Sequence, residues 1–402
     1  MPNKEEGKKA QEHTVQERVR FTNKVVKDGL RNVASHHIES FNYAFEKNLP
    51  RICKNMLAVE LAQQNTAGAG GKEPTQFPFK KYTMWFENFE LQKPQKPHAV
   101  DASEIRGTPE SSILLPYECR LRSMTYSAPL IATVCRKIDD EAPERVTLNL
   151  GDIPIMVLSN NCHLNGLNEE DLARAKEDMH EFGGYFIVNG NERLIRMLIM
   201  NKRNYPVCFE RGSFCNRGRL FTQYAVQMRC VREDMFAQTL TLHYLTDGNC
   251  VIKFIYHKQE FLVPVYVLLK ALMPSTNSDG ATDKMIFDKL VGTSQGRQDQ
   301  IEGLLSDGQK LCLYSQEQCL GYVGSRLRTV LEGITQEMSD VEVGRFLLER
   351  ILLVHCSQFK DKFNCLCLMI DKLYSYVAGE CSADNLDAVA NQEVMLGGHL
   401  YG

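Results

Sequence analysis

The stretch FGGYFIVNGNERLIRMLIMNKRNYP, from Phe182 to Pro206, carries the strongest signals in the sequence for both local structure and function. It combines a glycine pair, a short apolar strand over residues 185–188, an Asn-Gly pair and several basic residues. Asn189 and Gly190 favour a tight turn, because both residue types tolerate positive φ. The stretch therefore predicts a hairpin that begins at Tyr185 and reverses at Asn189-Gly190.

The two glycines before the strand have two possible uses. Gly183 and Gly184 allow left-handed backbone and a close approach of the chain to a neighbour. Asn168 looks like a helix N-cap, and the helix that it opens is expected to run to about Glu181. In that interpretation Gly183 is the C-cap of the helix.

The chain next to the hairpin is strongly basic. Between residues 193 and 219 it holds seven basic residues and one acid, Glu210. The basic residues are Arg193, Arg196, Lys202, Arg203, Arg211, Arg217 and Arg219. Tyr205, Phe209 and Phe214 lie among them, and basic side chains interleaved with aromatic rings suit contact with phosphates and stacking on bases. A solvated charged face is the alternative interpretation, and so is an internal ion pair between Glu192 and Arg193.

The rest of the chain alternates between helical and extended patterns, which predicts an α+β fold. An amphipathic helix is expected from Val33 to Leu61, with Ile38, Phe41 and Phe45 on its apolar face. A Gly-rich loop follows over residues 63–76, and strands are expected at 82–91 and 122–137. Residues 1–30 form a charged arm that is expected to be disordered or loosely helical.

The second half of the chain has a β-rich part followed by a helical part. Residues 238–257 predict a hairpin, because apolar residues alternate on both sides of the turn at Asp247-Gly248. From about Pro264 onward the pattern is mostly helical. Ser339 and Glu342 form a capping box at the start of one helix, and Gly379 follows the end of another.

Composition and motifs exclude several classes of function. The 402 residues are 43% hydrophobic, 24% charged and carry a net charge of -3, which is ordinary globular composition. The 14 cysteines include no C-x-x-C pair, so we expect no metal site. Their spacing shows no disulfide framework, so we expect the chain to reside in a reducing compartment. No secretion signal, membrane span, phosphate-binding G-x-x-x-x-G-K-[ST] loop, H-E-x-x-H helix or D-x-D cluster is present. The chain is therefore expected to bind or to support other molecules, with no catalytic residue of its own.

The quoted stretch resembles the second-largest subunit of multisubunit DNA-dependent RNA polymerases. The family carries a motif similar to GGYFIVNGNER, which stands here at Gly183 to Arg193, and IRMLIMNKRNYP resembles the RNA polymerase I version. Further resemblances, in the same order along the chain, are HIESFNYAF from residue 37, LPYECRLRSMTY from 115, PIMV from 154, TQYAVQMRCVRED from 222, LHYLTDG from 242, KFIYHKQEF from 253 and NQEVMLGGHLY from 391. One departure is Asn201, where the family usually has proline.

The resemblance implies an architecture of two domains. A mixed protrusion domain would cover residues 31–200 and return at 371–402, with an inserted α+β lobe domain at 201–370. Family members run to more than a thousand residues, and the chain stops in an apolar segment. The resemblance thus implies a truncated chain that lacks the hybrid-binding, wall, anchor and clamp regions.

The resemblance also implies a function within a larger assembly. The chain would form part of the nucleic-acid cleft of RNA polymerase I in the nucleus and nucleolus, in contact with the largest subunit, other subunits, template DNA and the RNA–DNA hybrid. Arg193, Arg196, Lys202 and Arg203 would face phosphates, while Gly183, Gly184, Asn189 and Gly190 would shape the backbone. Mg²⁺ would be held mainly by the largest subunit and zinc by the C-terminal region that the chain lacks, so this segment would bind no cofactor and no membrane. The alternative is a truncated, non-catalytic interaction protein that binds polymerase partners, and a third possibility is an independent nucleic-acid-binding module.

Overall fold

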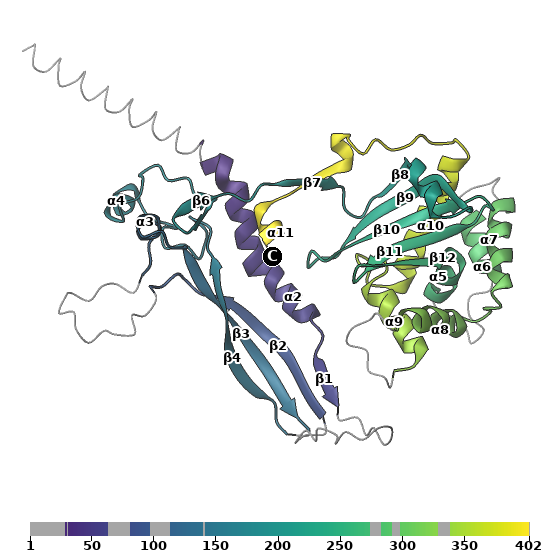
Figure 1. The fold of residues 1–402 in the computed structure, drawn as a ribbon, viewed down its shortest axis with the longest axis horizontal. Helices are drawn as coiled ribbons and strands as arrows, with labels where there is room; N and C mark the ends of the chain where they lie inside the picture. Colours follow the sequence, from purple (N-terminus) through teal and green to yellow (C-terminus); the bar gives the residue numbers. More distant parts are fainter. Residues whose placement is uncertain are drawn as a thin grey trace, which may run out of the picture. The chain divides into compact units, whose positions relative to one another are not determined.

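The computed structural model divides the chain into two compact units (Figure 1). The first unit consists of Met1–Leu198 with Met395–Gly402, and the second of Ile199–Val394. The structure describes residues 29, 31–62, 81–96, 113–139, 141–273, 283–291, 298–328 and 338–401. The expected N-terminal arm and the Gly-rich loop at 63–76 lie outside the described residues, apart from Gly29 of the arm.

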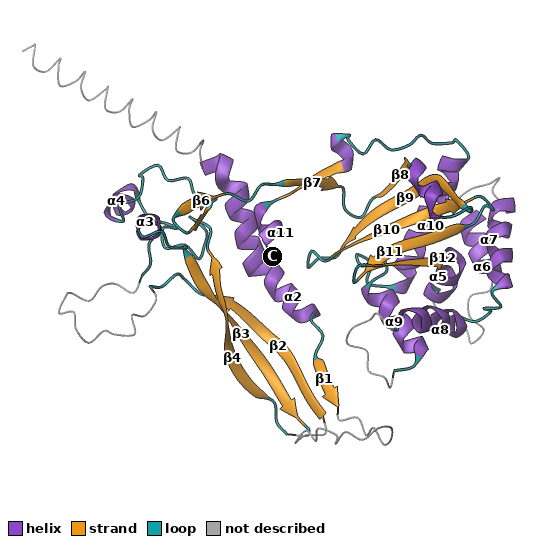
Figure 2. Ribbon diagram, in the orientation of Figure 1, coloured by secondary structure: helices purple, strands orange, loops and turns teal. Residues whose placement is uncertain are grey.

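The first unit combines one long helical segment with a four-stranded antiparallel sheet (Figure 2). Helix covers residues 31–43 and continues through η1 (Ala44–Asn48) into α2 (Leu49–Asn55). The sheet has the order β1 (Val59–Ala62), β2 (Lys81–Leu91), β3 (Ser127–Ile138) and β4 (Glu144–Pro154). The smaller elements are α3 (Pro116–Leu121), α4 (Glu169–Arg174), β5 (Phe186–Val188), β6 (Asn191–Arg193) and α11 (Gly397–Tyr401).

The helix expected to reach Leu61 ends earlier. Helical geometry stops at Asn55, and Met56 is already extended. Val59 and Leu61 then alternate along β1, where they pair with Met84 and Tyr82 of β2. The segment therefore forms a strand and not the last turn of the helix, because it pairs with β2, and its apolar residues recur every second position.

The helix that begins at Asn168 is also shorter than expected. It ends at Arg174, and the next residues close it in the manner of a Schellman cap. Lys176 has a φ of 60°, and the backbone N–H of Glu177 donates to the carbonyl of Leu172. Gly183 is therefore not the C-cap of this helix.

The core of the first unit lies where the helical segment meets the ends of the strands. Phe41 is fully buried there, together with Tyr126, Ile155 and Ile187. Ile38 and Phe45 are partly buried and pack against the same cluster, as their shared helix face predicted. The short C-terminal helix α11 contributes Tyr401 to it.

The second unit is a five-stranded antiparallel sheet with helices packed against it (Figure 2). The sheet has the order β12 (Gln259–Pro264), β11 (Cys250–Tyr256), β10 (Ala237–Leu245), β9 (Phe221–Val231) and β8 (Pro206–Glu210). The longer helices are α5 (Val265–Leu272), α6 (Asp283–Val291), α7 (Gln298–Lys310), α8 (Gln316–Leu327), α9 (Asp340–Arg350) and α10 (Phe359–Val377). The 3-10 turns are η2 (Gly212–Arg217) and η3 (Val389–Asn391), and β7 (Leu198–Asn201) pairs with β13 (Gln392–Met395).

Local signals in the second unit are confirmed by the structure. The predicted hairpin is β10 and β11, with Leu240 opposite Phe254 and Gly248 at a φ of 85°. The capping box forms, with the Ser339 side chain accepting from the backbone of Glu342 and the Glu342 side chain accepting from that of Ser339. The observed helices and antiparallel sheets confirm the α+β class.

The second boundary between the units lies further along the chain than expected. Residue 371 falls inside α10, whose buried face belongs to the core of the second unit from Phe363 to Tyr376. The chain re-enters the first unit only at Met395. A continuous amphipathic helix cannot be divided between two cores, so the boundary comes after the segment that follows α10.

Candidate nucleic-acid interface

The hairpin at the centre of the quoted stretch has the predicted geometry. Val188 pairs with Asn191 across a two-residue turn, and Ile187 pairs with Glu192. Asn189 and Gly190 have φ values of 50° and 75°, both in the left-handed region. Two successive positive φ angles are typical of the type I′ turn, whose twist matches that of the strands it joins.

The glycines of the stretch are required by close packing inside the first unit. A Cβ on Gly183 would lie 2.6 Å from the carbonyl oxygen of Val157, and a Cβ on Gly190 would lie 2.8 Å from the Cα of Ser123. Gly184 is less crowded, with the nearest atom, Cβ of Ala34, at 3.3 Å. These contacts hold the hairpin against its neighbours, which explains the tight backbone without a ligand.

An ion network centred on the partly buried Arg120 of α3 lies against the hairpin and joins the buried Glu177 to the exposed Glu192. Its guanidinium donates to Glu177 at 2.7 Å, to the hydroxyl of Tyr185 at 2.6 Å and to Glu192 at 2.9 Å. Tyr185 in turn donates to Glu181 at 2.9 Å. Glu192 therefore pairs with Arg120, and the predicted alternative of a Glu192–Arg193 pair is wrong.

The end of the network at Glu177 and Tyr185 is poorly solvated. Burial raises the pKa of the Glu177 carboxyl, against the opposing effect of Arg120. Burial also raises the pKa of Tyr185, and the carboxylate of Glu181 adds to that rise. The role of Arg120 has no local signal in the sequence, because its partners lie 57 to 72 residues away along the chain.

Arg193 and Arg196 remain available for contacts with another molecule. Both side chains are exposed, Arg193 at the end of β6 and Arg196 in the segment that follows. No hydrogen bond or ion pair joins either side chain to another described residue of the chain. Within residues 185–200, these two arginines are the basic residues, and both are exposed.

Lys202 and Arg203 belong to the second unit and are more engaged. Lys202 is exposed, with its Nζ 5.4 Å from the centre of the Tyr205 ring. Arg203 is half-buried, and its Nε donates to Glu393 of β13 at 3.0 Å. Arg229 binds the same carboxylate, and although burial opposes it, these arginines lower the pKa of Glu393. The charge of Arg203 is therefore already partly neutralised.

The aromatic residues of the basic stretch differ in their accessibility. Phe209 and Phe214 are 6% and 7% exposed and pack together with Ala225, so their faces are closed to a base. The guanidinium of Arg211 covers both rings, at 5.5 and 5.6 Å. Tyr205 is 38% exposed and is the member of the three that a base could reach.

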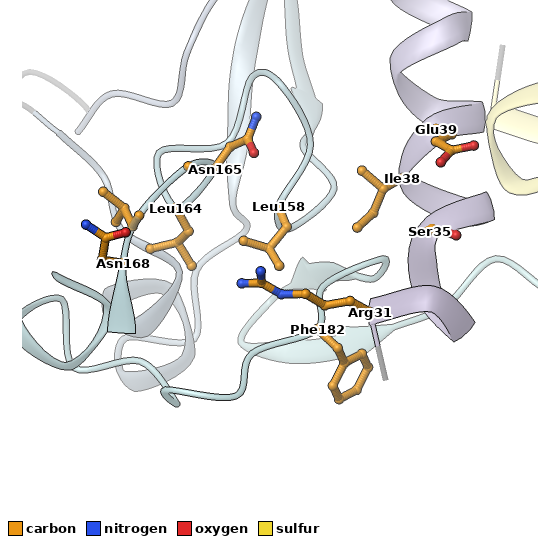
Figure 3. Close-up of a pocket in the computed structure, with 11 residues that line it drawn as sticks. Arg31, Ser35, Ile38, Glu39, Leu158, Leu164, Asn165, Asn168 and Phe182 are labelled. Atoms are coloured by element: carbon orange, nitrogen blue, oxygen red, sulfur yellow. The ribbon is translucent and has the colours of Figure 1, made fainter. Parts of the chain in front are cut away.

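A pocket in the first unit offers little charge to a ligand. It has a volume of about 470 Å³ and lies beside the helical segment at residues 31–43 (Figure 3). Arg31 and Glu39 are the charged residues of its lining, opposite Leu158, Leu164 and Phe182. A single arginine, in a lining that also holds a carboxylate, does not make a phosphate site, so we assign no ligand to this pocket.

None of the helices that the structure describes is both long enough and apolar enough to cross a bilayer. The 14 cysteines are all described, and none forms a disulfide.

Comparison with known proteins identifies the relatives of this chain. The family model described as RNA polymerase beta subunit matches residues 32–402. A protein of Euplotoides octocarinatus named DNA-directed RNA polymerase I subunit RPA2 is 46% identical over 386 residues, which is 95% of this chain. The protein of the same name from Neurospora crassa is 41% identical over 396 residues, which is also 95% of this chain. DNA-directed RNA polymerase I subunit 2 of Arabidopsis thaliana is 34% identical over 385 residues, which is 92% of this chain. The matched region spans 31%, 31% and 30% of those three proteins, so this chain covers about a third of their length.

Proposed function

Because the chain belongs to the RNA polymerase beta subunit family, we propose that it forms part of the nucleic-acid cleft of a DNA-directed RNA polymerase I. The assembled enzyme would transcribe ribosomal RNA genes from nucleoside triphosphates. This chain would supply cleft wall and subunit contacts, with no catalytic residue. The observation that carries the proposal is the similarity to polymerase I subunits over more than nine tenths of the chain. It also confirms the resemblance to the second-largest subunit of RNA polymerase I.

The proposed domains follow from the same membership. We propose that the first unit is the protrusion and that the second unit is the lobe. The division near residue 198 and the return at Met395 support an inserted domain. Membership in a polymerase further leads us to propose a nuclear and, more specifically, nucleolar location.

The proposed cofactor and partners lie mostly outside this chain. Two-metal nucleotidyl transfer would use Mg²⁺ held mainly by the largest subunit, and zinc would be bound in the C-terminal region of longer family members. The largest subunit, the other polymerase subunits, template DNA and the RNA–DNA hybrid are the proposed partners. No observation favours the alternative of a non-catalytic interaction protein.

Arg193 and Arg196 are the residues that we propose to contact phosphates first. They are exposed and lack a partner among the described residues, whereas Arg203 already binds Glu393. Lys202 is the proposed third contact, and Arg203 is the weakest of the four candidates. Glycines 183, 184 and 190, with Asn189, would act indirectly by fixing the hairpin that carries Arg193.

The test uses the polymerase purified through a tag on this subunit. Co-purification of the largest subunit is expected, and its absence would favour an interaction protein outside the enzyme.

In the assembled polymerase, Arg193→Ala with Arg196→Ala should weaken binding of template DNA and reduce the slope of log K against log salt by about 2, one for each phosphate contact. The matched control is Arg174→Ala, since Arg174 is exposed but pairs with Glu170 and Asp171 of its own helix. An unchanged slope in the double variant would exclude these two arginines as phosphate contacts.

A further inference from the structure

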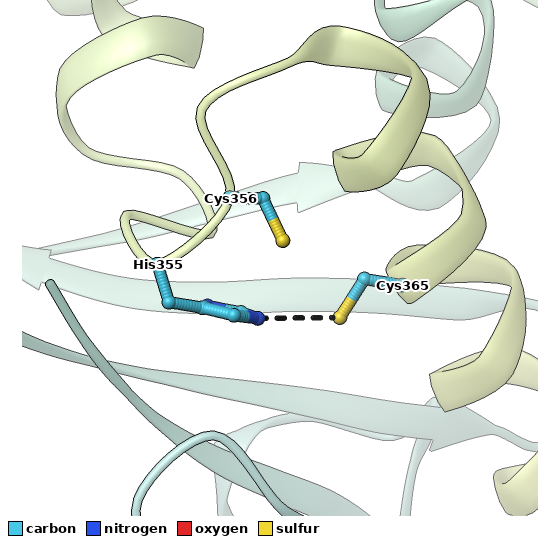
Figure 4. Close-up of side chains that lie close together, drawn as sticks. All are labelled: His355, Cys356 and Cys365. Carbon is cyan, nitrogen blue, oxygen red and sulfur yellow. Dashed lines mark hydrogen bonds between the residues drawn. The ribbon is translucent and has the colours of Figure 1, made fainter.

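Three side chains in the second unit form a cluster that the sequence did not predict. His355 and Cys356 are adjacent in the loop after α9, and Cys365 lies in the second turn of α10 (Figure 4). One nitrogen or sulfur atom from each of them lies within 4.8 Å of the other two. Among the described residues, this is the one group of three or more His, Cys, Asp or Glu that could hold a metal ion.

The distances in the cluster suit a small tetrahedral cation. Cys365 Sγ lies 3.7 Å from Nε2 of His355. Tetrahedral zinc, with bonds of about 2.3 Å to sulfur and about 2.05 Å to nitrogen, would separate such atoms by about 3.6 Å. The loop and the helix therefore already place two of the ligand atoms at the separation that zinc requires.

The imidazole has no strong partner within the protein. Nδ1 of His355 is buried without a hydrogen-bond partner among the described residues, and Nε2 faces the sulfur of Cys365. All three residues are half-buried, so solvent and an ion can reach them. With its proton on Nδ1, the neutral ring directs the lone pair of Nε2 at the two thiols, which is the form and orientation in which an imidazole ligates a metal ion.

A buried lysine fixes the backbone beside the cluster. Lys362 is fully buried and donates to the carbonyls of Leu348, Glu349 and Leu352 at 2.6, 2.9 and 2.7 Å. These contacts tie α10 to the end of α9, so the two segments that carry the three ligands are held together. Preorganised ligands lose little conformational entropy when an ion binds.

The ligand set also balances the charge of a dication. A thiolate is the form of cysteine that ligates metals, and binding of a dication would ionise both thiols. Two thiolates, a neutral imidazole and Zn²⁺ carry no net charge together.

We propose that His355, Cys356 and Cys365 form a binding site for Zn²⁺ in the second unit. The two sulfur ligands and one nitrogen ligand select a thiophilic cation over Mg²⁺ or Ca²⁺. One tetrahedral position remains for a solvent molecule or a ligand from outside the chain. The site is independent of the proposed polymerase function, and it differs from the sequence prediction that the chain has no metal site.

The test measures Zn²⁺ binding by the 402-residue chain under reducing, oxygen-free conditions. A chromophoric chelator competes for the metal, and Co²⁺ provides a second probe. The wild-type chain should bind about one more Zn²⁺ than the variant with His355→Ala, Cys356→Ala and Cys365→Ala. Loss of a residue that only supports a metal ligand weakens metal binding at least about tenfold. The single change Cys365→Ala removes a direct ligand, so it should weaken Zn²⁺ binding by more than that.

A control and the cobalt spectrum separate ligation from general damage to the fold. Cys367→Ala removes a buried cysteine two residues away on the same helix and should keep the wild-type affinity. Wild-type chain with Co²⁺ should show a thiolate charge-transfer band and the visible bands of tetrahedral cobalt, which need no variant to interpret. The proposal is overturned if the wild-type and the triple variant bind equal zinc, if the cobalt bands are absent, or if Cys356 and Cys365 form a disulfide that resists reduction.

Discussion

Arg120 is the residue on which the hairpin region depends most. Replacement by methionine keeps much of its volume but leaves Glu177, whose side chain is 2% exposed, without its cation. Breaking such a buried pair by removal of one partner is expected to cost about 3 kcal/mol of unfolding free energy. Urea denaturation of the purified chain measures the loss.

Arg136→Met is the matched control for that change. Arg136 also binds a glutamate, Glu144, but both side chains are about half exposed, at 44% and 60%. An exposed pair contributes much less to stability than a buried one, because solvent and salt screen it, so Arg136→Met should lower the unfolding free energy far less than Arg120→Met. Equal losses in the two variants would show that the Arg120 network does not stabilise the first unit beyond an ordinary surface pair.

His243 is expected to make the second unit sensitive to acid. Its ring is fully buried among aromatic residues, and neither nitrogen has a hydrogen-bond partner among the described residues. Burial lowers the pKa of His243 from 6.5 to about 4, and Arg217 and Lys253 contribute to the shift. The unfolded chain then takes up a proton more readily than the folded chain, so stability is lost as the pH falls from about 6.5 towards 4.

The size of this effect follows from the two pKa values. Between pH 7.5 and pH 5 the single histidine should reduce the unfolding free energy by about 2 kcal/mol. His243→Phe removes the titrating group and keeps a ring in the site, so the variant should lose less stability on acidification than the wild type. Urea denaturation at several pH values gives both slopes, and equal slopes would disprove the role of His243.

Individual residues were predictable from sequence where the signal is local. The turn at Asn189-Gly190 was correctly predicted, because two adjacent residue types determine it. The Arg120 network could not be predicted, because it joins segments that only the folded chain brings together. The same limit applies to His355, Cys356 and Cys365, whose spacing matches no familiar ligand motif.

At the scale of the element, the hairpin of β5 and β6 depends on the absence of a side chain at Gly190. Gly190→Ala would place a Cβ 2.8 Å from the Cα of Ser123 at a φ of 75°. Both the left-handed backbone and the overlap with a neighbouring backbone are costly, so the change should destabilise the first unit by more than about 2 kcal/mol. Urea denaturation checks this value.

Gly248→Ala is the control, because it shares the backbone strain without the overlap. Gly248 has a φ of 85° in the turn between β10 and β11, and a Cβ there would have no atom within 4 Å. Gly248→Ala should lower the unfolding free energy by only about 1–2 kcal/mol, which is the cost of a left-handed backbone for a residue other than glycine. If the two glycines are equally tolerant of alanine, packing against Ser123 does not hold the hairpin in place.

Elements with a strong periodic pattern were predictable, and their ends were less so. The hairpin of β10 and β11 and the capped helix α9 follow from alternation and from a capping box. By contrast, β1 looked like a continuation of the helix, because its strand character comes from pairing with β2. Helix α4 is closed by Lys176, two residues after its end, in a left-handed conformation that no sequence rule assigns to that residue type.

At the scale of the whole molecule, each unit has a core of its own. The main cluster of the first unit draws its buried residues from positions 41–187, and that of the second unit from positions 208–376. The structure divides the chain between Leu198 and Ile199, close to the basic stretch where the character of the sequence changes. The apolar face of α10 gives no sign in the sequence of which core it joins, so pattern alone does not determine where the chain returns to the first unit.

The returning segment is expected to stabilise the first unit alone. Tyr401 of α11 stacks on Phe186 with ring centres 5.1 Å apart, and its hydroxyl donates to the carbonyl of Pro154 at 2.8 Å. Tyr401→Ala removes both contacts and should cost about 3 kcal/mol, whereas Tyr401→Phe keeps the stacking and should cost about 1 kcal/mol. Hydrogen exchange should become faster in β3 and β5 of the alanine variant and stay unchanged in β10, because the cores are separate. Equal loss of protection in β10 would mean that the two units unfold as one.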